Sequence, residues 1–260
     1  MGKSVVSGTK PGIDMIENAQ LISLSRQMAL QRHMDMVANN IANLNTTGFK
    51  AEQLLFEEFK MPVASHGDFS GEDRTLSYVQ DWATVQDFSS GAMVETGSPL
   101  DLAIMGDGFF TVQTAAGERW TRAGAFQLNN NGVLVDMSGN PVMGEGGQIQ
   151  FGPEETDIRI AADGSISSSA GAKGRLRIVE FAEPQALVRE GQNLFSGGTP
   201  GANVNSKVMQ GFTEKSNVSG VAEMAEMIRV TRAYESIASL GQKQDDMRRD
   251  AIKRLGSLNA

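Results

Sequence analysis

The two ends of this chain carry long segments that favour helix, and these segments limit the folds open to it. Residues 16–44 contain neither proline nor glycine, and residues 221–255 contain no proline and a single glycine. Most of the 29 glycines lie between these segments. Glycine suits tight turns and weakens helix interiors, so such a middle is typical of turn-rich β structure. We therefore expect an α+β fold, with N- and C-terminal helices paired into a coiled-coil-like domain and a central antiparallel all-β domain.

Apolar residues of the N-terminal segment fall on two faces of the predicted helix. One stripe steps by 4, 3, 4 and 3 residues and consists of Leu30, Met34, Val37, Ile41 and Leu44. Leu21, Leu24 and Met28 also have helical spacing, but at about 100° per residue they lie on another face. The pair Thr47-Gly48 predicts the helix end, because glycine adopts the left-handed conformation at low cost.

The C-terminal segment repeats this pattern of two apolar faces. One stripe consists of Val221, Met224, Ala225 and Ile228. A second, about half a turn away, consists of Met227, Val230, Tyr234 and Ile237, with Ile252 and Leu255 farther on. The side chains of Asn217-Val218-Ser219 are suited to capping the start of this helix.

Two apolar faces on each helix require more than one packing partner. One face can pack against the other helix of the same chain, and the second must meet the β region or another molecule. A bundle closed within one chain remains an alternative. We expect Asn39, Asn40 and Asn43 to hydrogen-bond across subunits, as buried polar residues do in coiled coils, or simply to face solvent. The predicted assembly residues are Leu30, Met34, Val37, Asn39, Asn40, Ile41, Asn43, Leu44, Val221, Met224, Ile228, Val230, Tyr234 and Ile237.

Short runs of period two, separated by turn residues, predict an antiparallel sandwich or irregular barrel in the middle of the chain. The expected strands are Leu100–Met105, Phe109–Gln113, Gln127–Leu128, Val133–Val135, Ile149–Phe151, Ile158–Ile160 and Leu176–Phe181.

These patterns predict a division into four parts. Residues 1–14 form a disordered leader or tag, and Met15 is an alternative natural start. Residues 15–50 and 216–260 form the terminal helical domain, and residues 100–215 form the β domain. Residues 51–99 form a connector, with a helix over Ala51–Lys60 and a mobile loop over Ser65–Arg74.

Composition argues against several classes of function. The net charge of −8 disfavours nucleic-acid binding, no apolar run could span a membrane, and the first residues lack the apolar core of a signal peptide. The chain has no cysteine and two isolated histidines, His33 and His66, so no metal or cofactor site is expected. Acidic residues beside glycines are ordinary turn chemistry, so no catalytic residue is expected. Those residues are Asp101, Asp107, Asp136 and Asp163.

Four ordered blocks of sequence resemble the signature of the flagellar rod and hook protein family. The first block runs from Val37 to Lys50 and reads VANNIANLNTTGFK. The second reads TGSPLDLAI from Thr96 and continues into GDGFF, and the third reads TRAGAF from Thr121. The fourth lies in the C-terminal segment and includes Ser216-Asn217-Val218 and Arg232-Ala233-Tyr234-Glu235. The resemblance covers residues 15–255, almost the whole chain.

This resemblance implies a structural subunit of the bacterial flagellar basal-body rod rather than an enzyme. Terminal helices would assemble into a helical tube that transmits torque and surrounds the export channel. The implied partners are copies of the chain, other rod proteins and the flagellar export apparatus. The implied location is the basal body within the periplasmic space, reached without a cleaved signal peptide.

Other assignments remain open at this level. The short connection between Lys50 and Leu100 is most similar to proximal rod members, and a distal rod or hook-type subunit is the alternative. From another class, a secreted β-rich binding module with a helical stalk also fits the pattern of elements.

Overall fold

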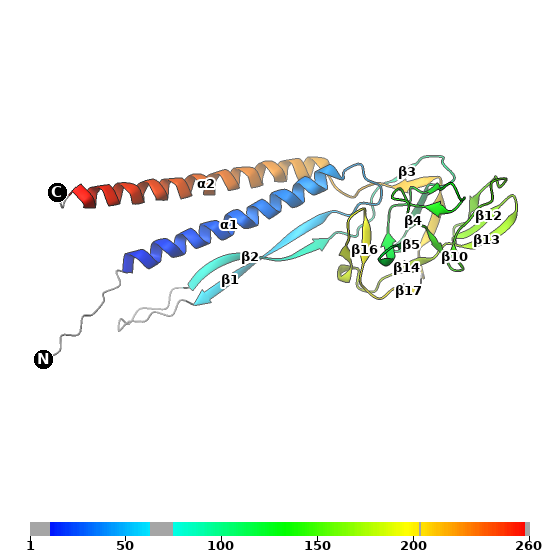
Figure 1. Ribbon diagram of the computed structural model, residues 1–260, viewed down its shortest axis with the longest axis horizontal. Coiled ribbons are helices and arrows are strands. Elements are labelled where there is room, and N and C mark those ends of the chain that lie inside the picture. Colours follow the sequence, from blue (N-terminus) through cyan, green and yellow to red (C-terminus); the bar gives the residue numbers. More distant parts are fainter. Residues whose placement is uncertain (1–10, 63–74, 203, 258–260) are drawn as a thin grey trace. The chain divides into compact units, whose positions relative to one another are not determined.

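A computed structural model describes residues 11–62, 75–202 and 204–257 (Figure 1). Two long helices flank all the strands in sequence, α1 over Pro11–Ala42 and α2 over Gly220–Ser257. The helices contact each other, and the strands between them pair antiparallel, so the expected α+β class is confirmed. Most of the expected leader lies outside the described residues, but its last four, Pro11–Asp14, already form the first turn of α1. Proline suits this position because the first amide of a helix has no partner within it.

The helices belong to a compact unit that also contains a long two-stranded sheet. This unit comprises Met1–Ala38, Leu54–Thr84 and Met224–Ala260. Strand β1, Glu52–Pro62, pairs with β2, Thr75–Gln86. Helices α1 and α2 run antiparallel, as the blue and orange-red ribbons of Figure 1 show.

Strand β1 corrects the helix expected over Ala51–Lys60, which was wrong. The segment favours no element strongly by itself, whereas β2 is rich in β-branched and aromatic residues that suit a pleated sheet. Pairing with such a partner decides the conformation of β1. The loop expected over Ser65–Arg74 lies outside the described residues.

The second compact unit comprises Asn39–Gln53 and Val85–Glu223 and contains the remaining strands. Its largest sheet has six strands in the order β15-β16-β6-β5-β14-β17, and β11-β12-β13 form a smaller sheet. The other strands pair two by two, as β18-β4, β19-β3, β7-β8 and β10-β9. The bounds are β3 Met93–Glu95, β4 Leu102–Met105, β5 Phe109–Thr114, β6 Gly117–Thr121, β7 Gln127–Leu128, β8 Leu134–Val135, β9 Met143–Gly144, β10 Gly147–Gln148, β11 Arg159–Ile160, β12 Ser165–Ser168, β13 Gly171–Arg175, β14 Ile178–Glu180, β15 Val188–Arg189, β16 Leu194–Ser196, β17 Gly201–Ala202, β18 Lys207–Gln210 and β19 Phe212–Glu214, with a 3-10 helix at Pro184–Ala186.

Two apolar clusters form the interior of this β unit. The larger cluster packs aliphatic residues from many strands around Phe110, whose ring meets Phe126 edge to face at 5.1 Å. The smaller cluster is aromatic and is built around Phe109, Trp120, Phe181 and Phe195. Strand β5 is buried at four successive positions, so its neighbours Phe109 and Phe110 serve different clusters on its two faces.

The structure confirms the strands expected in this region in all but one place. Residues 149–151 form no strand, and Val133 and Gln150 share only an isolated bridge. Ile149 and Phe151 are instead buried in the larger cluster, so apolar content alone misled the prediction. The expected connector over residues 51–99 is shared between the two compact units. The domain limits expected from the sequence stay a prediction.

Candidate assembly surface

Helix α1 carries one covered and one exposed apolar face. Val37 of the predicted stripe is fully buried, and the other members of that stripe are half-buried. On the other face, Leu24 is 53% exposed and Met28 is 51% exposed. The sequence therefore separated the two faces correctly, and the structure shows which of them remains open to solvent.

Helix α2 repeats this arrangement. Val221 is 78% exposed, Met224 51% and Ile228 54%, so the first stripe faces solvent over the first turns of the helix. The second stripe is covered, with Val230 buried and with Met227, Tyr234 and Ile237 half-buried. Val37 and Val230, both predicted at an interface between subunits, therefore lie inside the single chain.

Polar contacts join α1 to α2 beside the covered stripes. The Thr231 hydroxyl lies 3.8 Å from the Met34 sulfur, and the His33 imidazole lies 3.4 Å from a Glu226 carboxylate oxygen. Glu226 also pairs with Arg229 one turn farther along α2. These contacts involve residues of both helices, so one face of each helix is committed to the other helix.

The three predicted interface asparagines have different surroundings. Asn40 is fully buried, and its side chain donates to the Glu52 carbonyl at 2.9 Å and accepts from the Glu52 amide at 3.0 Å. Its hydrogen-bonding groups are thus used within the chain rather than across subunits. Asn43 donates to the Asn39 carbonyl at 2.9 Å and accepts from the Thr46 hydroxyl at 3.0 Å. Asn39 stays exposed.

The expected end of α1 and the expected cap at Asn217 differ from the structure, whereas α2 begins at Gly220, next to its expected start. Helix α1 ends at Ala42, before Thr47-Gly48. Gly48 does have a positive φ of 65°, but it is required for close packing, because a Cβ there would lie 2.3 Å from the Arg122 backbone. Asn217 does not cap α2, since its side chain accepts from the Ala51 amide at 2.7 Å and donates to the Asp87 carbonyl at 2.8 Å.

A buried charged cluster in the β unit was not expected from sequence. Lys50 and Glu214 are fully buried, and the Lys50 ammonium donates to Glu214 Oε1 at 2.7 Å and to the Ser89 carbonyl at 2.7 Å. Arg122 is buried beside them, with Nε 3.9 Å from Glu214 Oε2. Burial lowers the pKa of the Lys50 ammonium, and the attraction of the Glu214 carboxylate opposes that shift. The partners lie far apart in sequence, so no local pattern could have identified the pair.

The remaining polar groups show ordinary structural roles. Asp136 and Asp163 accept hydrogen bonds from backbone amides of their own turns. His66 lies outside the described residues. Across the described part of the chain, no group of three potential metal-binding side chains occurs, and no helix is long and apolar enough to cross a membrane.

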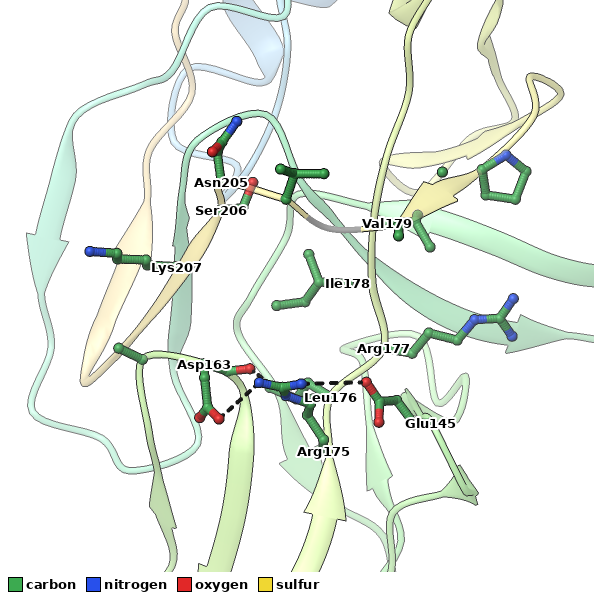
Figure 2. Close-up of a pocket in the computed structure, with 15 residues that line it drawn as sticks. Glu145, Asp163, Arg175, Leu176, Arg177, Ile178, Val179, Asn205, Ser206 and Lys207 are labelled. Carbon is green, nitrogen blue, oxygen red and sulfur yellow. Dashed lines mark hydrogen bonds and ion pairs between the residues drawn. The ribbon is translucent and has the colours of Figure 1, made fainter.

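Two cavities open on the β unit. The larger, of about 680 Å³, contains Arg175 between two carboxylates, with Asp163 at 2.9 Å and Glu145 at 3.9 Å (Figure 2). Arg177, which lines the same cavity, pairs with Glu118 at 2.6 Å. The smaller, of about 340 Å³, is lined by amide and hydroxyl side chains, among them Asn39 and Asn43, and by the charged Glu52, Asp136 and Arg189. In the larger cavity, the charged groups of Glu145, Asp163 and Arg175 are thus paired with each other.

Comparison with known proteins gives three family matches along the chain. Residues 21–50 match "Flagella basal body rod protein", residues 103–168 match "Flagellar hook protein FlgE/F/G D1 domain", and residues 209–254 match "Flagellar basal body rod FlgEFG protein C-terminal". A flagellar basal-body rod protein FlgF from Caulobacter vibrioides is 39% identical over 94% of this chain and its own full length. This chain belongs to the flagellar basal-body rod protein family.

Other relatives agree with this family assignment. A FlgF from Mesorhizobium japonicum is 35% identical over 93% of this chain and 99% of its own length. A FlgG from Bacillus subtilis is 31% identical over 88% of this chain and 96% of its own length. The rod family is one of structural, non-enzymatic proteins. The first matched region contains most of α1 and Lys50, the second contains Arg122, and the third contains Glu214 and most of α2.

Proposed function

We propose that this rod-family protein is a proximal rod subunit that polymerises through its terminal helices. The helices pack against neighbouring copies and other rod proteins to form a helical tube that transmits torque and surrounds the export channel. The β unit forms the outer part of that tube. The flagellar export apparatus delivers the chain, uncleaved, to the basal body within the periplasmic space.

The exposed apolar stripes of the helices carry this proposal. Leu24 and Met28 on α1, and Val221, Met224 and Ile228 on α2, face solvent although each helix already has a covered face. Fully burying an exposed side chain of this kind contributes about 1.5–3 kcal/mol, and the side chains that are already about half covered contribute about half as much. Five of them per copy supply a substantial driving force for association.

The asymmetry of the helices supports head-to-tail association rather than a two-fold dimer. The exposed stripes of α1 and α2 differ in sequence and position, so one copy offers two unlike surfaces. A contact between unlike surfaces that does not close on itself generates a filament. The exposed amide of Asn39 fixes the register of neighbours through hydrogen bonds, whereas Asn43 uses its amide on Asn39 and Thr46 within the chain.

Charging the exposed stripe of α2 tests this proposal. We expect the double variant Met224→Asp/Ile228→Asp to stay folded as a monomer, because both side chains already face solvent. It should lose incorporation into basal bodies, since two carboxylates would be buried without partners. The measurements are swimming motility and immunodetection of the protein in purified basal bodies.

The matched control is Gln242→Asp, which adds a carboxylate at an exposed polar position farther along α2. It should incorporate normally. Normal motility of the Met224→Asp/Ile228→Asp variant would show that this stripe is not an assembly surface.

The route to the cell envelope and the role in the rod are tested separately. Mass spectrometry of the chain recovered from basal bodies should show an unprocessed N-terminus. Electron microscopy of a deletion strain should show basal bodies without a complete rod. Intact rods in that strain would contradict the proposed role of the chain as a rod subunit.

A further inference from the structure

The segment that follows α1 and the segment that precedes α2 are hydrogen-bonded to each other inside the β unit. The Gly48 amide donates to the Glu214 carbonyl at 2.8 Å, and the Asn217 amide donates to the Phe49 carbonyl at 3.4 Å. The Ala51 amide donates to the Asn217 side chain at 2.7 Å. Together with the Lys50–Glu214 ion pair, these bonds join Gly48–Ala51 to Glu214–Asn217, and we call this junction the root clamp.

The centre of the root clamp is shielded from water and tied into the β unit. Glu214 Oε1 accepts from both the Lys50 ammonium and the Gly91 amide, at 2.7 and 2.8 Å. Arg122 donates to the Gly106 carbonyl at 2.6 Å, so the charge beside Glu214 is anchored in a different part of the fold. Hydrogen bonds away from water are stronger than exposed ones, because water does not compete for their partners.

The position of the root clamp in the chain gives it a mechanical meaning. Helix α1 ends at Ala42 and α2 begins at Gly220, so both helices leave the β unit a few residues from the clamp. Lys50 and Glu214 are 164 residues apart in sequence. Lys50 precedes β1, and Glu214 is the last residue of β19. Once α1 and α2 have separated, tension between the two chain ends therefore reaches the clamp before it reaches the strands from β1 to β18.

We propose that the root clamp carries load from one terminal helix to the other and so shields the β unit from tension. This inference extends the proposed torque transmission and depends on it for its biological meaning. The clamp closes the segment between Lys50 and Glu214 into a loop outside the load path. The backbone bonds resist separation of the two segments, and the buried ion pair holds them in register.

Pulling single full-length chains by their two ends tests the clamp without requiring a rod. Opening it puts the enclosed segment under tension, and unfolding of that segment then extends the chain by about 560 Å, at roughly 3.4 Å for each of the 164 residues. We expect Lys50→Met to raise the rate of this step at constant force by about tenfold or more, because Glu214 loses its nearest buried partner.

The matched control is Lys173→Met, which removes the Lys173–Glu155 pair at another place in the β unit. Because this pair lies inside the shielded segment, its loss should change the rate by about twofold or less. Asn217→Ala removes the bonds of the Asn217 side chain to Ala51 and Asp87 without touching a charge, and it should raise the rate as Lys50→Met does.

Circular dichroism without load must first show that each variant is folded. If Lys50→Met does not fold, the rate of Asn217→Ala compared with that of Lys173→Met tests the clamp. Equal rates for the folded clamp variants and Lys173→Met would overturn the clamp as a load-carrying element. That result would leave rod assembly untouched, since incorporation into basal bodies is measured separately.

Discussion

The two compact units of this protein bury their apolar residues in different ways. In the β unit, two clusters enclose side chains from many strands, and the exposed apolar residues lie on separate strands and turns. In the helical unit, α1 and α2 cover one face of each other and leave large apolar side chains exposed in rows at helical spacing.

This difference indicates which unit depends on partners. A contiguous apolar surface on a soluble protein marks an interaction site, whereas scattered apolar residues are ordinary. The β unit therefore has the features of a self-sufficient body. The helices have the features of an element that is completed by neighbours.

Overpacking the β unit should give the largest effect in the monomer. A Cβ on Gly124 would lie 1.6 Å from the Leu102 carbonyl oxygen, a distance that no side-chain movement can relieve. We expect Gly124→Ala to lower the free energy of unfolding by about 3 kcal/mol or more, measured by urea titration.

Gly146→Ala is the matched control for this substitution. A Cβ at Gly146 would have no heavy atom within 4 Å, and the residue has no positive φ. Its free energy of unfolding should stay close to the wild-type value. A Gly124→Ala protein as stable as Gly146→Ala would show that the packing of this unit is looser than described.

Charging the two faces of α2 should separate internal from external packing. Val230 is buried and Ile228 is exposed on the same helix. Val230→Asp should cost about 3 kcal/mol in pairing of the helices, because it buries an unpaired carboxylate. Ile228→Asp should leave that pairing intact in the monomer. Hydrogen exchange of the α1 and α2 amides measures both effects.

The two variants together sharpen the comparison of the units. Faster helix exchange is expected in Val230→Asp only, with the amides of β5 and β6 unchanged in both variants. Similar exchange in Val230→Asp and Ile228→Asp would mean that α1 and α2 do not depend on the face assigned as covered.

The helical faces could be predicted from sequence because their signal is local. Residues three and four apart in a helix lie on one face whatever the rest of the chain does, so both stripes of α2 were separated correctly. The same reasoning could not say which stripe is covered, since that depends on the partner helix.

Features that need a distant partner were missed or misjudged. Asn40 is buried, and its side chain is hydrogen-bonded to the backbone of Glu52. The segment of β1 is a strand because β2 pairs with it. The Lys50–Glu214 pair joins residues 164 positions apart. Residues 37–50 resembled the family signature, but resemblance did not show that Lys50 is the buried end of a root clamp.

The smallest effect concerns Glu155, a carboxylate of the β unit whose side chain is 11% exposed. Hydrogen bonds from Lys173 and Ser168 hold the pKa of Glu155 at about 2, below its ordinary value of 4.5. Because the pKa is lower in the folded chain, Glu155 stabilises the fold above pH 4.5, and this contribution disappears as the pH falls from 4.5 towards 2.

Glu155→Gln should therefore weaken the dependence of unfolding free energy on pH in that interval, measured by urea titration. Glu154→Gln alters an exposed neighbour and should retain the wild-type dependence. An equal loss in both variants would contradict the role given to the Lys173–Glu155 pair.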